Sequence, residues 1–477
     1  MQQAYEAAVV AAAERVAIDA VGGDALMRRA AFAVAGAVCA ELRERTGGVT
    51  GRRVCLLVGS GGNGGDALWA GVILRRRGVA VTAALLVPER ANPAGLAALL
   101  RSGGRRGSRT DVAAADLIID GIVGLSARGP LRPDAAALVA AVQAPVVAVD
   151  LPSGVHPDTG AVLGAAVRAD VTVTFGARKP VHLLNPGHCG RVLLVDLGFV
   201  LPVAAMAALT RAEVGAGWPV PGAEDDKYTQ GVVGVLAGSA VYPGAAVLCT
   251  GAAVTATSGM VRYAGTAKDA VLARWPEVVA TDELTDVGRV QAWVAGPGLG
   301  TGEQALGVVR HVLHQDVPVL LDADALTVIA EHPELLAARS GPVLLTPHAG
   351  EFTRLTGAPP GPDRVSAVRA AAARFRATVL LKGAITVVAD PDGQVLVNPA
   401  GSSWVSTAGA GDLLSGVVGA LLAGGLAPLH AGAAGAHVHV LAAELAAVQG
   451  EVGAPVSASA VLDQLRPAIR GVRSAAR

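Results

Sequence analysis

A glycine-rich turn near the end of the chain carries a single carboxylate. Residues 406–412 read S-T-A-G-A-G-D, and an apolar run begins directly afterwards at Leu413. Backbone N–H groups exposed at the start of a helix carry partial positive charge and attract phosphate. Asp412 would then stand beside bound phosphate, where it could take a proton from a hydroxyl group that is being phosphorylated. The alternative is a plain turn in which Asp412 only caps the helix.

A second glycine-rich turn follows the first apolar run of the chain, residues 53–58. Residues 59–66 read G-S-G-G-N-G-G-D and satisfy the G-x-G-x-x-G pattern, which is a weak signal when it stands alone. A dinucleotide-binding fold also places an acidic residue about twenty positions later, at the end of the second strand. Residues 83–87 read A-A-L-L-V, and no acid occurs before Glu89. The pattern therefore disfavours an ordinary NAD dehydrogenase.

Polar groups follow other apolar runs in the first half of the chain. Asp120 precedes a glycine-bearing loop at residues 121–130, Asp150 precedes a loop that contains Ser153, and residues 178–179 add two cations. One aspartate at the end of a strand is usually a structural cap. Several such turns at one edge of a sheet indicate a binding site, because open α/β sheets bind ligands beyond the carboxyl ends of their strands.

The second half of the chain repeats this arrangement of polar residues after apolar runs. Residues 319–324 end in two acids, residues 344–351 carry His348 and Glu351, and residues 379–383 end in Lys382 and a glycine. Taken singly, His348 is more often a satisfied turn residue and Lys382 a solvated strand end. Their succession before the glycine turn favours a site over these structural readings.

Apolar runs that alternate with helical patterns predict an α/β protein. The first half is expected to form a doubly wound, Rossmann-like domain, with a helix over residues 4–45 and another over residues 67–77. A break rich in glycine and proline at residues 210–222 reads as a linker. We therefore expect two domains, at residues 1–215 and 222–477.

The composition excludes several functional classes. Hydrophobic residues make up 52% of the 477 residues and charged residues 16%, which suits large cores rather than disorder. Lysine plus arginine equals aspartate plus glutamate at 39 each, so nucleic acid is not an expected partner. The four cysteines contain no C-x-x-C pair, which favours a reducing cytoplasm over zinc or disulfides.

One segment raises the question of a membrane. Residues 413–443 contain no Asp, Glu, Lys or Arg and could span about 30 Å. The segment also contains three histidines and a Gly-Gly pair followed by a proline. Two buried helices of a globular domain explain it better. The N-terminus lacks the basic and apolar regions of a signal peptide, so a cytoplasmic protein without a membrane partner is expected.

Residues 1 to about 212 resemble the epimerase domain of bifunctional NAD(P)H-hydrate repair enzymes. The family turn G-x-G-N-N-G-G-D-G matches here with Gly62 for the first Asn and Ala67 for the last Gly. The resemblance implies a potassium ion held by Asn63, Asp120 and Ser153, whose oxygen atoms suit a hard cation. It also implies that the hydrated nicotinamide nucleotide contacts Gly62, Asn63, Gly64, Gly65, Asp66, Gly124, Leu125, Ser126, Ala127, Arg128, Gly129, Pro130 and Asp150.

Residues 222–477 resemble the ribokinase-like fold and, within it, the ADP/ATP-dependent NAD(P)H-hydrate dehydratase. The T-P-H-x-G-E, K-G-x-x-T and G-x-G-D-x-L-S-G elements occur in the family's order, and no P-loop motif is present. The resemblance implies adenine nucleotide at Lys382, Gly383, Ala384, Ile385, Thr386 and Gly411. It implies that Ala245, Gly298, His348 and Asp412 contact the hydrate, and that magnesium accompanies ADP or ATP.

Both resemblances together predict an enzyme that repairs NADH or NADPH hydrated at the 5,6 double bond. Its first domain would interconvert the R and S hydrates, with Asp150 as acid/base, and its second would use Asp412 to phosphorylate and dehydrate the S form. ADP is favoured as the donor, giving AMP and phosphate, and ATP remains open. We also expect a homo-oligomer. The alternatives are a ribokinase-like kinase of a vitamin or sugar with a non-catalytic nucleotide-binding domain, and a binding scaffold without catalysis.

Overall fold

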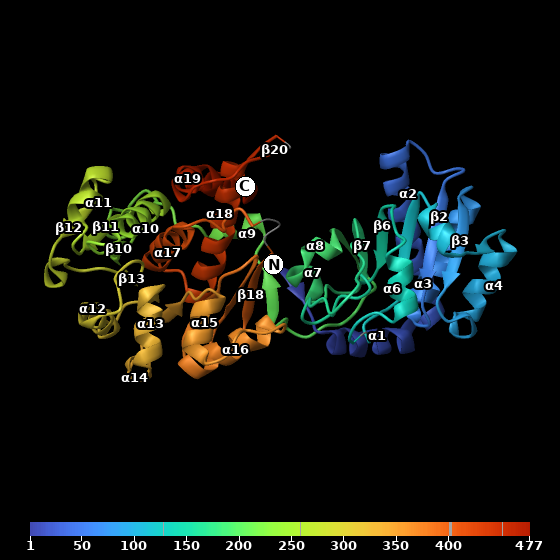
Figure 1. Ribbon diagram of the computed structural model, residues 1–477, viewed down its shortest axis with the longest axis horizontal. Helices are drawn as coiled ribbons and strands as arrows, with labels where there is room; N and C mark the ends of the chain where they lie inside the picture. Colours follow the sequence, from blue (N-terminus) through green and yellow to red (C-terminus); the bar gives the residue numbers. More distant parts are fainter. Residues whose placement is uncertain (127, 258, 400–402, 451) are drawn as a thin grey trace. The chain divides into compact units, whose positions relative to one another are not determined.

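The computed structural model describes residues 1–126, 128–257, 259–399, 403–450 and 452–477. The chain divides into two compact units, an N-terminal unit of Gln3–Met206 and a C-terminal unit of Ala207–Arg477 together with Met1–Gln2. Figure 1 shows that each unit has its own sheet with helices packed around it.

The N-terminal unit is built on a parallel sheet in the order β4-β3-β2-β5-β6-β7-β8. The chain passes from β2 to β3 on one side and later to β5 on the other, so the carboxyl ends of β2 and β5 form a topological switch point. The strands are β2 (Arg53–Val58), β3 (Ala80–Leu85), β4 (Arg105–Arg106), β5 (Leu117–Gly121), β6 (Val146–Val149), β7 (Val171–Phe175) and β8 (Arg191–Val195).

Alternate residues of these apolar strands enter separate cores on the two faces of the sheet. Leu56 packs in a cluster with residues of α2 and α3, whereas Leu57 packs in a cluster with Val112 and Ala135. Burial on both faces is what the continuous apolar runs predict. The helices are α1 (Ala7–Val21), α2 (Gly23–Thr46), α3 (Gly62–Arg76), α4 (Pro93–Arg101), α5 (Arg109–Ala113), α6 (Pro133–Val139), α7 (Val181–Leu184) and α8 (Pro186–Cys189), with a 3-10 turn η1 (Pro88–Arg90).

Two expected helices differ in their limits. The helix expected over residues 4–45 is interrupted at Gly22, whose φ of 86° ends α1 before α2 begins, and the chain starts with strand β1 (Gln2–Ala4). The helix expected over residues 67–77 begins five residues earlier, at Gly62. The Gly-rich turn thus forms the first turn of α3, because the extended Gly61 is its N-cap.

The sheet of the C-terminal unit has the order β1-β9-β18-β17-β16-β15-β14-β13-β10-β11-β12. Strands from β12 to β16 pair in parallel, and β16, β17 and β18 pair antiparallel. The strands are β9 (Met206–Ala208), β10 (Val232–Leu236), β11 (Met260–Ala264), β12 (Val279–Thr281), β13 (Ala292–Ala295), β14 (Val319–Leu321), β15 (Val343–Leu345), β16 (Thr378–Leu381), β17 (Ile385–Ala389) and β18 (Val395–Pro399), with a separate pair β19 (Val448–Gln449) and β20 (Val452–Gly453).

The expected linker is partly wrong, because a helix forms within it. Thr210 and Glu213 make a capping box that starts α9, and Val214 and Trp218 are buried in the core of the C-terminal unit. The helices of this unit are α9 (Arg211–Gly217), α10 (Pro243–Ala256), α11 (Lys268–Arg274), α12 (Glu303–Leu313), α13 (Asp324–Glu331), α14 (Glu334–Ala337), α15 (Ala349–Thr356), α16 (Arg364–Phe375), α17 (Ala410–Ala423), α18 (Pro428–Ala447) and α19 (Ala458–Ala475), with a 3-10 turn η2 (Leu284–Asp286).

Helix α17 packs at unusually short range against its neighbours. A Cβ atom added to Gly416 would lie 2.1 Å from the backbone oxygen of Cys249 on α10, and one added to Gly419 would lie 2.1 Å from a methyl group of Val294 on β13. Most residues of the charge-free segment 413–443, which forms most of α17 and α18, are buried in the core of the C-terminal unit, as expected. Within the described part of the chain, no helix combines the length and apolarity needed to cross a membrane.

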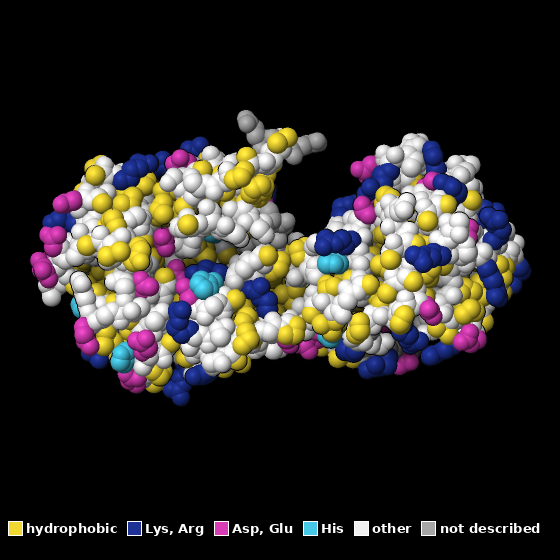
Figure 2. All heavy atoms as spheres, in the orientation of Figure 1, with side chains coloured by type: hydrophobic (Ala, Val, Ile, Leu, Met, Phe, Trp, Pro, Cys, Tyr) yellow, Lys and Arg dark blue, Asp and Glu magenta, His cyan; other side chains and the backbone are white. Residues whose placement is uncertain are grey.

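Charged side chains are spread over the face of the molecule that Figure 2 draws. On the face drawn in Figure 2, Lys and Arg side chains are scattered among apolar and uncharged ones. This distribution agrees with the equal numbers of basic and acidic residues, 39 of each.

Candidate functional site

The glycine turn of residues 406–412 forms the start of α17. Gly409 is the N-cap residue, with a φ of 83° that favours glycine, and it makes no side-chain cap. Asp412 lies in the first helical turn and is half-buried, so the reading of Asp412 as a mere cap is wrong. Its carboxylate is therefore available for another role.

A buried network joins the first turns of α17 to the ends of two strands. Lys382, which follows β16, donates from Nζ to Asp322 Oδ1 at 2.7 Å, and Ser415 on α17 donates from Oγ to Asp322 Oδ2 at 2.7 Å. The Lys382 ammonium also lies 3.7 Å from Glu351 Oε2. A Cβ atom on Gly411 would be 3.6 Å from Lys382 Nζ, so this cation lies at the glycine turn.

The network sets the charges around Asp412. Burial, reinforced by the neighbouring Asp322 carboxylate, raises the pKa of Asp412 to about 7, although the Lys382 ammonium opposes the shift. Burial acts to lower the pKa of Lys382, but Asp322 and Glu351 outweigh it and raise that pKa. The site thus combines a permanent cation with a carboxyl group that exchanges its proton near neutral pH.

His348 caps a helix, which agrees with the reading of this histidine as a satisfied turn residue. It is the N-cap of α15, where its Nδ1 accepts hydrogen bonds from the backbone N–H groups of Gly350 at 2.9 Å and Glu351 at 3.3 Å. Because Nδ1 accepts, the proton of the neutral ring is on Nε2. The side chain is 59% exposed, and its Nε2 lies 3.5 Å from Glu351 Oε1.

The remaining residues expected at this site lie at the carboxyl ends of strands or on neighbouring loops. Gly298 has a φ of 65°, and a Cβ atom there would be 2.9 Å from Cβ of Ala245, so these two positions adjoin. Gly383 and Ala384 are exposed after Lys382, and Thr386 is buried on β17 next to Ile385. Asp322 and Ser415, which organise the network, were not selected as site residues from sequence. For Asp322, the position at the end of an apolar run was the only feature of the sequence that indicated a functional role.

In the N-terminal unit, Asp150 stands at the end of β6 in a left-handed backbone conformation with φ 68°. Its carboxylate pairs with the Lys179 ammonium, and Thr174 Oγ1 donates to Oδ1 at 3.0 Å. Both charged side chains of this pair are almost fully buried, at 6% and 1% exposure. The sequence showed Lys179 only as one of two neighbouring cations and did not indicate that it pairs with Asp150.

A buried histidine fixes the backbone beside Asp150. Nδ1 of His182 accepts from the backbone N–H of Lys179 at 2.9 Å, so its other nitrogen, Nε2, carries the proton and donates to the Asp150 carbonyl at 2.9 Å. Burial and the nearby Lys179 lower the pKa of His182 to about 4, which keeps the ring neutral. His182 therefore orients the turn and does not exchange protons near neutral pH.

The Asp150 carboxylate faces a cavity of about 400 Å³. Glu14 of α1 and Asp66 of α3 line the same cavity. Burial, with a further contribution from the negative charges of Asp150 and Glu14, raises the pKa of Asp66 well above its ordinary value. Burial and Asp150 likewise raise the pKa of Glu14. The cavity thus holds an ion pair and two carboxyl groups whose pKa values are raised.

The three residues expected to hold potassium form a connected group. Ser153 donates from Oγ to Asp120 Oδ1 at 2.7 Å and accepts at the same oxygen from the backbone N–H of Val123 at 3.2 Å. Asn63 donates from Nδ2 to the carbonyls of Val123 at 2.8 Å and Val149 at 2.7 Å. Asp120 is 1% exposed, and no Lys or Arg among the described residues pairs with it. Among those residues, no cluster of three or more His, Cys, Asp or Glu side chains could hold a metal ion.

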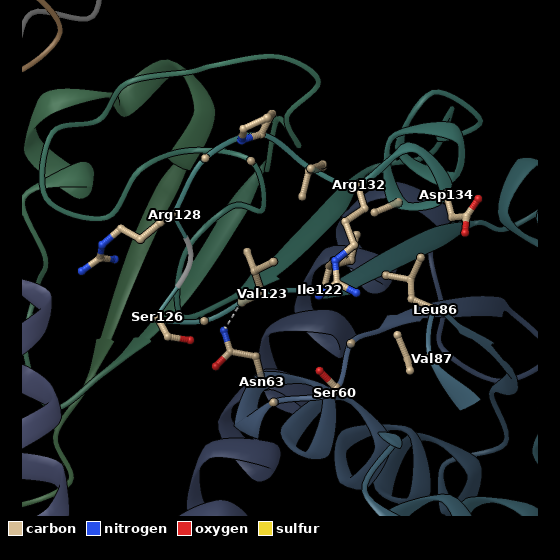
Figure 3. A pocket seen from close by; sticks show the side chains of 18 of the residues that line it. Ser60, Asn63, Leu86, Val87, Ile122, Val123, Ser126, Arg128, Arg132 and Asp134 are labelled. Atoms are coloured by element: carbon tan, nitrogen blue, oxygen red, sulfur yellow. Dashed lines mark hydrogen bonds between the residues drawn. The ribbon is translucent and has the colours of Figure 1, made fainter. Parts of the chain in front are cut away.

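A second cavity of about 610 Å³ adjoins the first (Figure 3). Among the residues expected to bind substrate, Asn63, Gly124, Ser126 and Arg128 line both cavities. Gly62 and Leu125 line only the first, and Gly129 and Pro130 only the second. Ala127 lies outside the described residues.

Two of the expected contact residues line neither cavity. A Cβ atom on Gly64 would be 2.3 Å from the Gly59 oxygen, and one on Gly65 would be 3.0 Å from the Met27 methyl group. These two glycines allow α3 to approach the neighbouring backbone and α2 closely. Both glycines are therefore buried packing positions of α3.

Both units match families of known proteins. A family model described as NAD(P)H-hydrate dehydratase matches residues 233–465, and one described as YjeF-related protein N-terminus matches residues 23–181. A bifunctional NAD(P)H-hydrate repair enzyme of Mycobacterium tuberculosis is 58% identical over 398 residues, covering 83% of this chain and 84% of that protein. One from Mycobacterium leprae is 56% identical over 473 residues, covering 98% of this chain and 99% of that protein.

Solved structures match the C-terminal part of the chain. The ADP/ATP-dependent NAD(P)H-hydrate dehydratase of Bacillus subtilis, co-crystallised with ATP and Mg²⁺, is 31% identical with a TM-score of 0.50. The match covers 56% of this chain and 98% of that one. A ribokinase-like superfamily protein of Enterococcus faecalis, at 23% identity and a TM-score of 0.50, shares the fold. The expected fold class is thereby confirmed.

Proposed function

The chain belongs to the family of bifunctional NAD(P)H-hydrate repair enzymes, and on this premise we propose which residues carry each reaction. The enzyme interconverts the R and S hydrates of NADH and NADPH and dehydrates the S hydrate in a nucleotide-driven reaction. We assign the epimerase to residues 1–215 and the dehydratase to residues 222–477. The N-terminal and C-terminal family matches lie within these limits.

Asp412 is the general base of the dehydratase in this proposal. It takes the proton of the C6 hydroxyl while that oxygen forms a bond to the terminal phosphorus of the donor. With ADP as donor, the bond from that phosphorus to the bridging oxygen breaks and AMP leaves. The C6–O bond then breaks with release of phosphate, and loss of a proton from C5 restores the 5,6 double bond. A pKa of about 7 suits a base that must work at neutral pH.

Lys382 and the glycine turn would hold the nucleotide. The ammonium lies at Gly411, where a phosphate can be close to both the cation and the backbone N–H groups of α17. Residues 383–386, which follow Lys382, would also contact the nucleotide. Ala245, Gly298 and His348 would contact the hydrate. Magnesium bound together with the nucleotide would neutralise charge on its phosphates. Asp324, whose charge raises the pKa of Asp412, is the side chain that would help to hold it.

The epimerase reaction is proposed to use Asp150 as its acid/base. In the hydrate the C6 hydroxyl is on a carbon bonded to the ring nitrogen. The nitrogen lone pair can therefore expel the hydroxyl as water once a proton is supplied, leaving an iminium ion. Water then adds to C6 from the opposite face and gives up a proton. Asp150, paired with Lys179, suits the acceptor, and the buried carboxyl group of Asp66 suits the donor.

Asn63, Asp120 and Ser153 are proposed to hold a potassium ion. The support is the chemistry of these residues. The buried Asp120 carboxylate has no cationic partner among the described residues and accepts a hydrogen bond from the Ser153 hydroxyl, and the Asn63 amide is linked to Ser153 through Val123. The ion would supply the missing positive charge and tie residues 121–126 to the turn after β6. We further propose a homo-oligomer in the cytoplasm, a compartment that suits four buried free cysteines.

The observation that carries the dehydratase assignment is the half-buried Asp412 beside the Lys382 ammonium. The direct test incubates the enzyme with chemically prepared NADH hydrate and either ADP or ATP, and follows each epimer separately. We expect recovery of the absorbance of reduced nicotinamide, with the R epimer consumed through the S epimer. A stable phosphorylated product without NADH would indicate a small-molecule kinase instead.

A further inference from the structure

The cavity beside Asp150 adjoins a second cavity. Its volume of about 400 Å³ suits the hydrated ring and its ribose, whereas the substrate is a dinucleotide with a second nucleoside and two phosphates. The adjoining cavity has a volume of about 610 Å³. Gly61, Asn63, Gly124 and Ser126 belong to the walls of both cavities, so a ligand can pass from one into the other along these residues.

The second cavity lies where parallel α/β sheets bind nucleotides. Its walls come from the carboxyl ends of β2, β3 and β5, next to the switch point between β2 and β5. In Figure 3, Asn63 and Ser126 border one side of it, and Leu86 and Val87 border the other. These last two provide an apolar wall at the end of β3, farthest from the side shared with the Asp150 cavity.

Arg132 gives this cavity an anion-binding group. In Figure 3 its side chain reaches toward the middle of the cavity, above Ser60, whereas the Asp134 carboxylate points outward. No carboxylate among the described residues forms an ion pair with the Arg132 guanidinium. Glu89 lines the cavity near Leu86 and Val87, and its negative charge disfavours a phosphate at that end of the cavity. An anion is therefore best accommodated between Arg132 and the turn of residues 59–61.

We propose that this second cavity binds the adenosine diphosphate half of the hydrated dinucleotide and that Arg132 binds its pyrophosphate. The inference rests on the proposed epimerase function. The nicotinamide ring would lie beside Asp150, the pyrophosphate would cross between Ser60 and Arg132, and the adenosine would lie against Leu86 and Val87. Arg132 is two residues beyond the loop that the family resemblance assigns to the substrate.

The test compares three substrates in epimerisation: the hydrates of NADH and NADPH, and that of reduced nicotinamide riboside, which lacks both phosphates and the adenosine. Arg132→Ala should raise KM about tenfold or more for both dinucleotides, because a charge-assisted bond to phosphate is lost. Its kcat should stay within about twofold, and the KM for the riboside should not change. Arg132→Lys should give an intermediate KM, since it keeps the charge without the planar fork.

Arg101→Ala is the matched control, because Arg101 is an exposed arginine of the same unit that lines neither cavity. It should leave all three KM values unchanged. An unchanged KM for both dinucleotides in Arg132→Ala would overturn the inference. So would an equal loss with the riboside, or a loss confined to the NADPH hydrate, which would indicate contact with the 2′-phosphate. A wild-type enzyme that does not epimerise any of the hydrates would count against the proposed function itself.

Discussion

The ammonium nitrogen of Lys382 lies 2.7 Å from Asp322 Oδ1, and the other oxygen of that carboxylate accepts a hydrogen bond from Ser415 on α17. Asp322 therefore ties the cation at the end of β16 to the helix that carries Asp412. Because Asp322 is 1% exposed, water does not compete for either contact. The relative position of cation and candidate base is thus set by a residue that needs no contact with substrate.

Replacing Asp412 by Asn should lower the dehydration rate by about 100-fold or more, because general-base catalysis is lost while the shape of the side chain is kept. Epimerisation by the same preparation should be unchanged. Asp463→Asn, at an exposed position on α19, removes the same charge and should leave both activities intact. Near-normal dehydration by Asp412→Asn would show that another group takes the proton.

The dehydration rate should rise with pH through about 7. Asp412 must be deprotonated to act as a base, and burial raises its pKa to about 7, so activity is lost as the pH falls below that value. Asp322→Asn removes a charge that raises this pKa, so the ascending limb of kcat/KM against pH should move to lower pH. A limb that stays at the same pH in this variant would contradict the assignment.

Gly411→Ala should weaken nucleotide binding by about tenfold or more and leave the fold intact. The added methyl group would be 3.6 Å from Lys382 Nζ, an ordinary contact distance, but it would occupy the space proposed for phosphate. Calorimetric titration with ADP and ATP measures the loss. Gly307→Ala on α12, where an added Cβ meets no atom within 4 Å, is the control and should bind normally. Equal affinities in the two variants would place the nucleotide elsewhere.

Lys179→Met should destabilise the N-terminal unit by about 3–5 kcal/mol, because it leaves the buried Asp150 carboxylate without its partner. Hydrogen exchange of the β6 and β7 amides in the full chain reports this local change. Lys268→Met breaks an ion pair at the surface and should leave the same amides unaffected. Unchanged protection in Lys179→Met would mean that the Asp150 carboxylate is neutralised without this lysine.

Potassium should raise the melting temperature of the N-terminal unit, since a ligand that binds only the folded state stabilises it. Asp120→Asn should abolish this response, because it removes the one carboxylate of the proposed donor set. Differential scanning calorimetry in potassium chloride, with choline chloride at equal ionic strength as the reference, measures the difference. An identical response of wild type and variant would exclude these residues as the cation site.

The sequence predicted the strands well because their apolar runs are buried on both faces. It also located Asp120, Asp150 and Lys382, since residues that directly follow such runs lie at the carboxyl edge of the sheet. Helix limits were harder to predict. Glycine gives no periodic signal, so the start of α3 at Gly62 and the break at Gly22 could not be read from the pattern.

The sequence could not predict which side chains pair when they lie far apart along the chain. Ser415 and Asp322 are separated by 93 positions, and Lys179 and Asp150 by 29. Only the folded arrangement brings these pairs together. The expected linker failed for a similar reason: the residues of α9 contain two glycines, and their helical state depends on the burial of Val214 and Trp218 in the C-terminal core.

The tight packing of α17 has a consequence for how the protein tolerates mutation. Gly416 and Gly419 leave no room for even a methyl group, so an alanine at either position must push the helix outward and carry Asp412 with it. A scan of all single substitutions should therefore find inactive variants spaced along the buried side of this helix, at sites that no ligand reaches. Selection for activity would keep glycine at these two positions, although they contact no ligand and only allow α17 to pack closely against its neighbours.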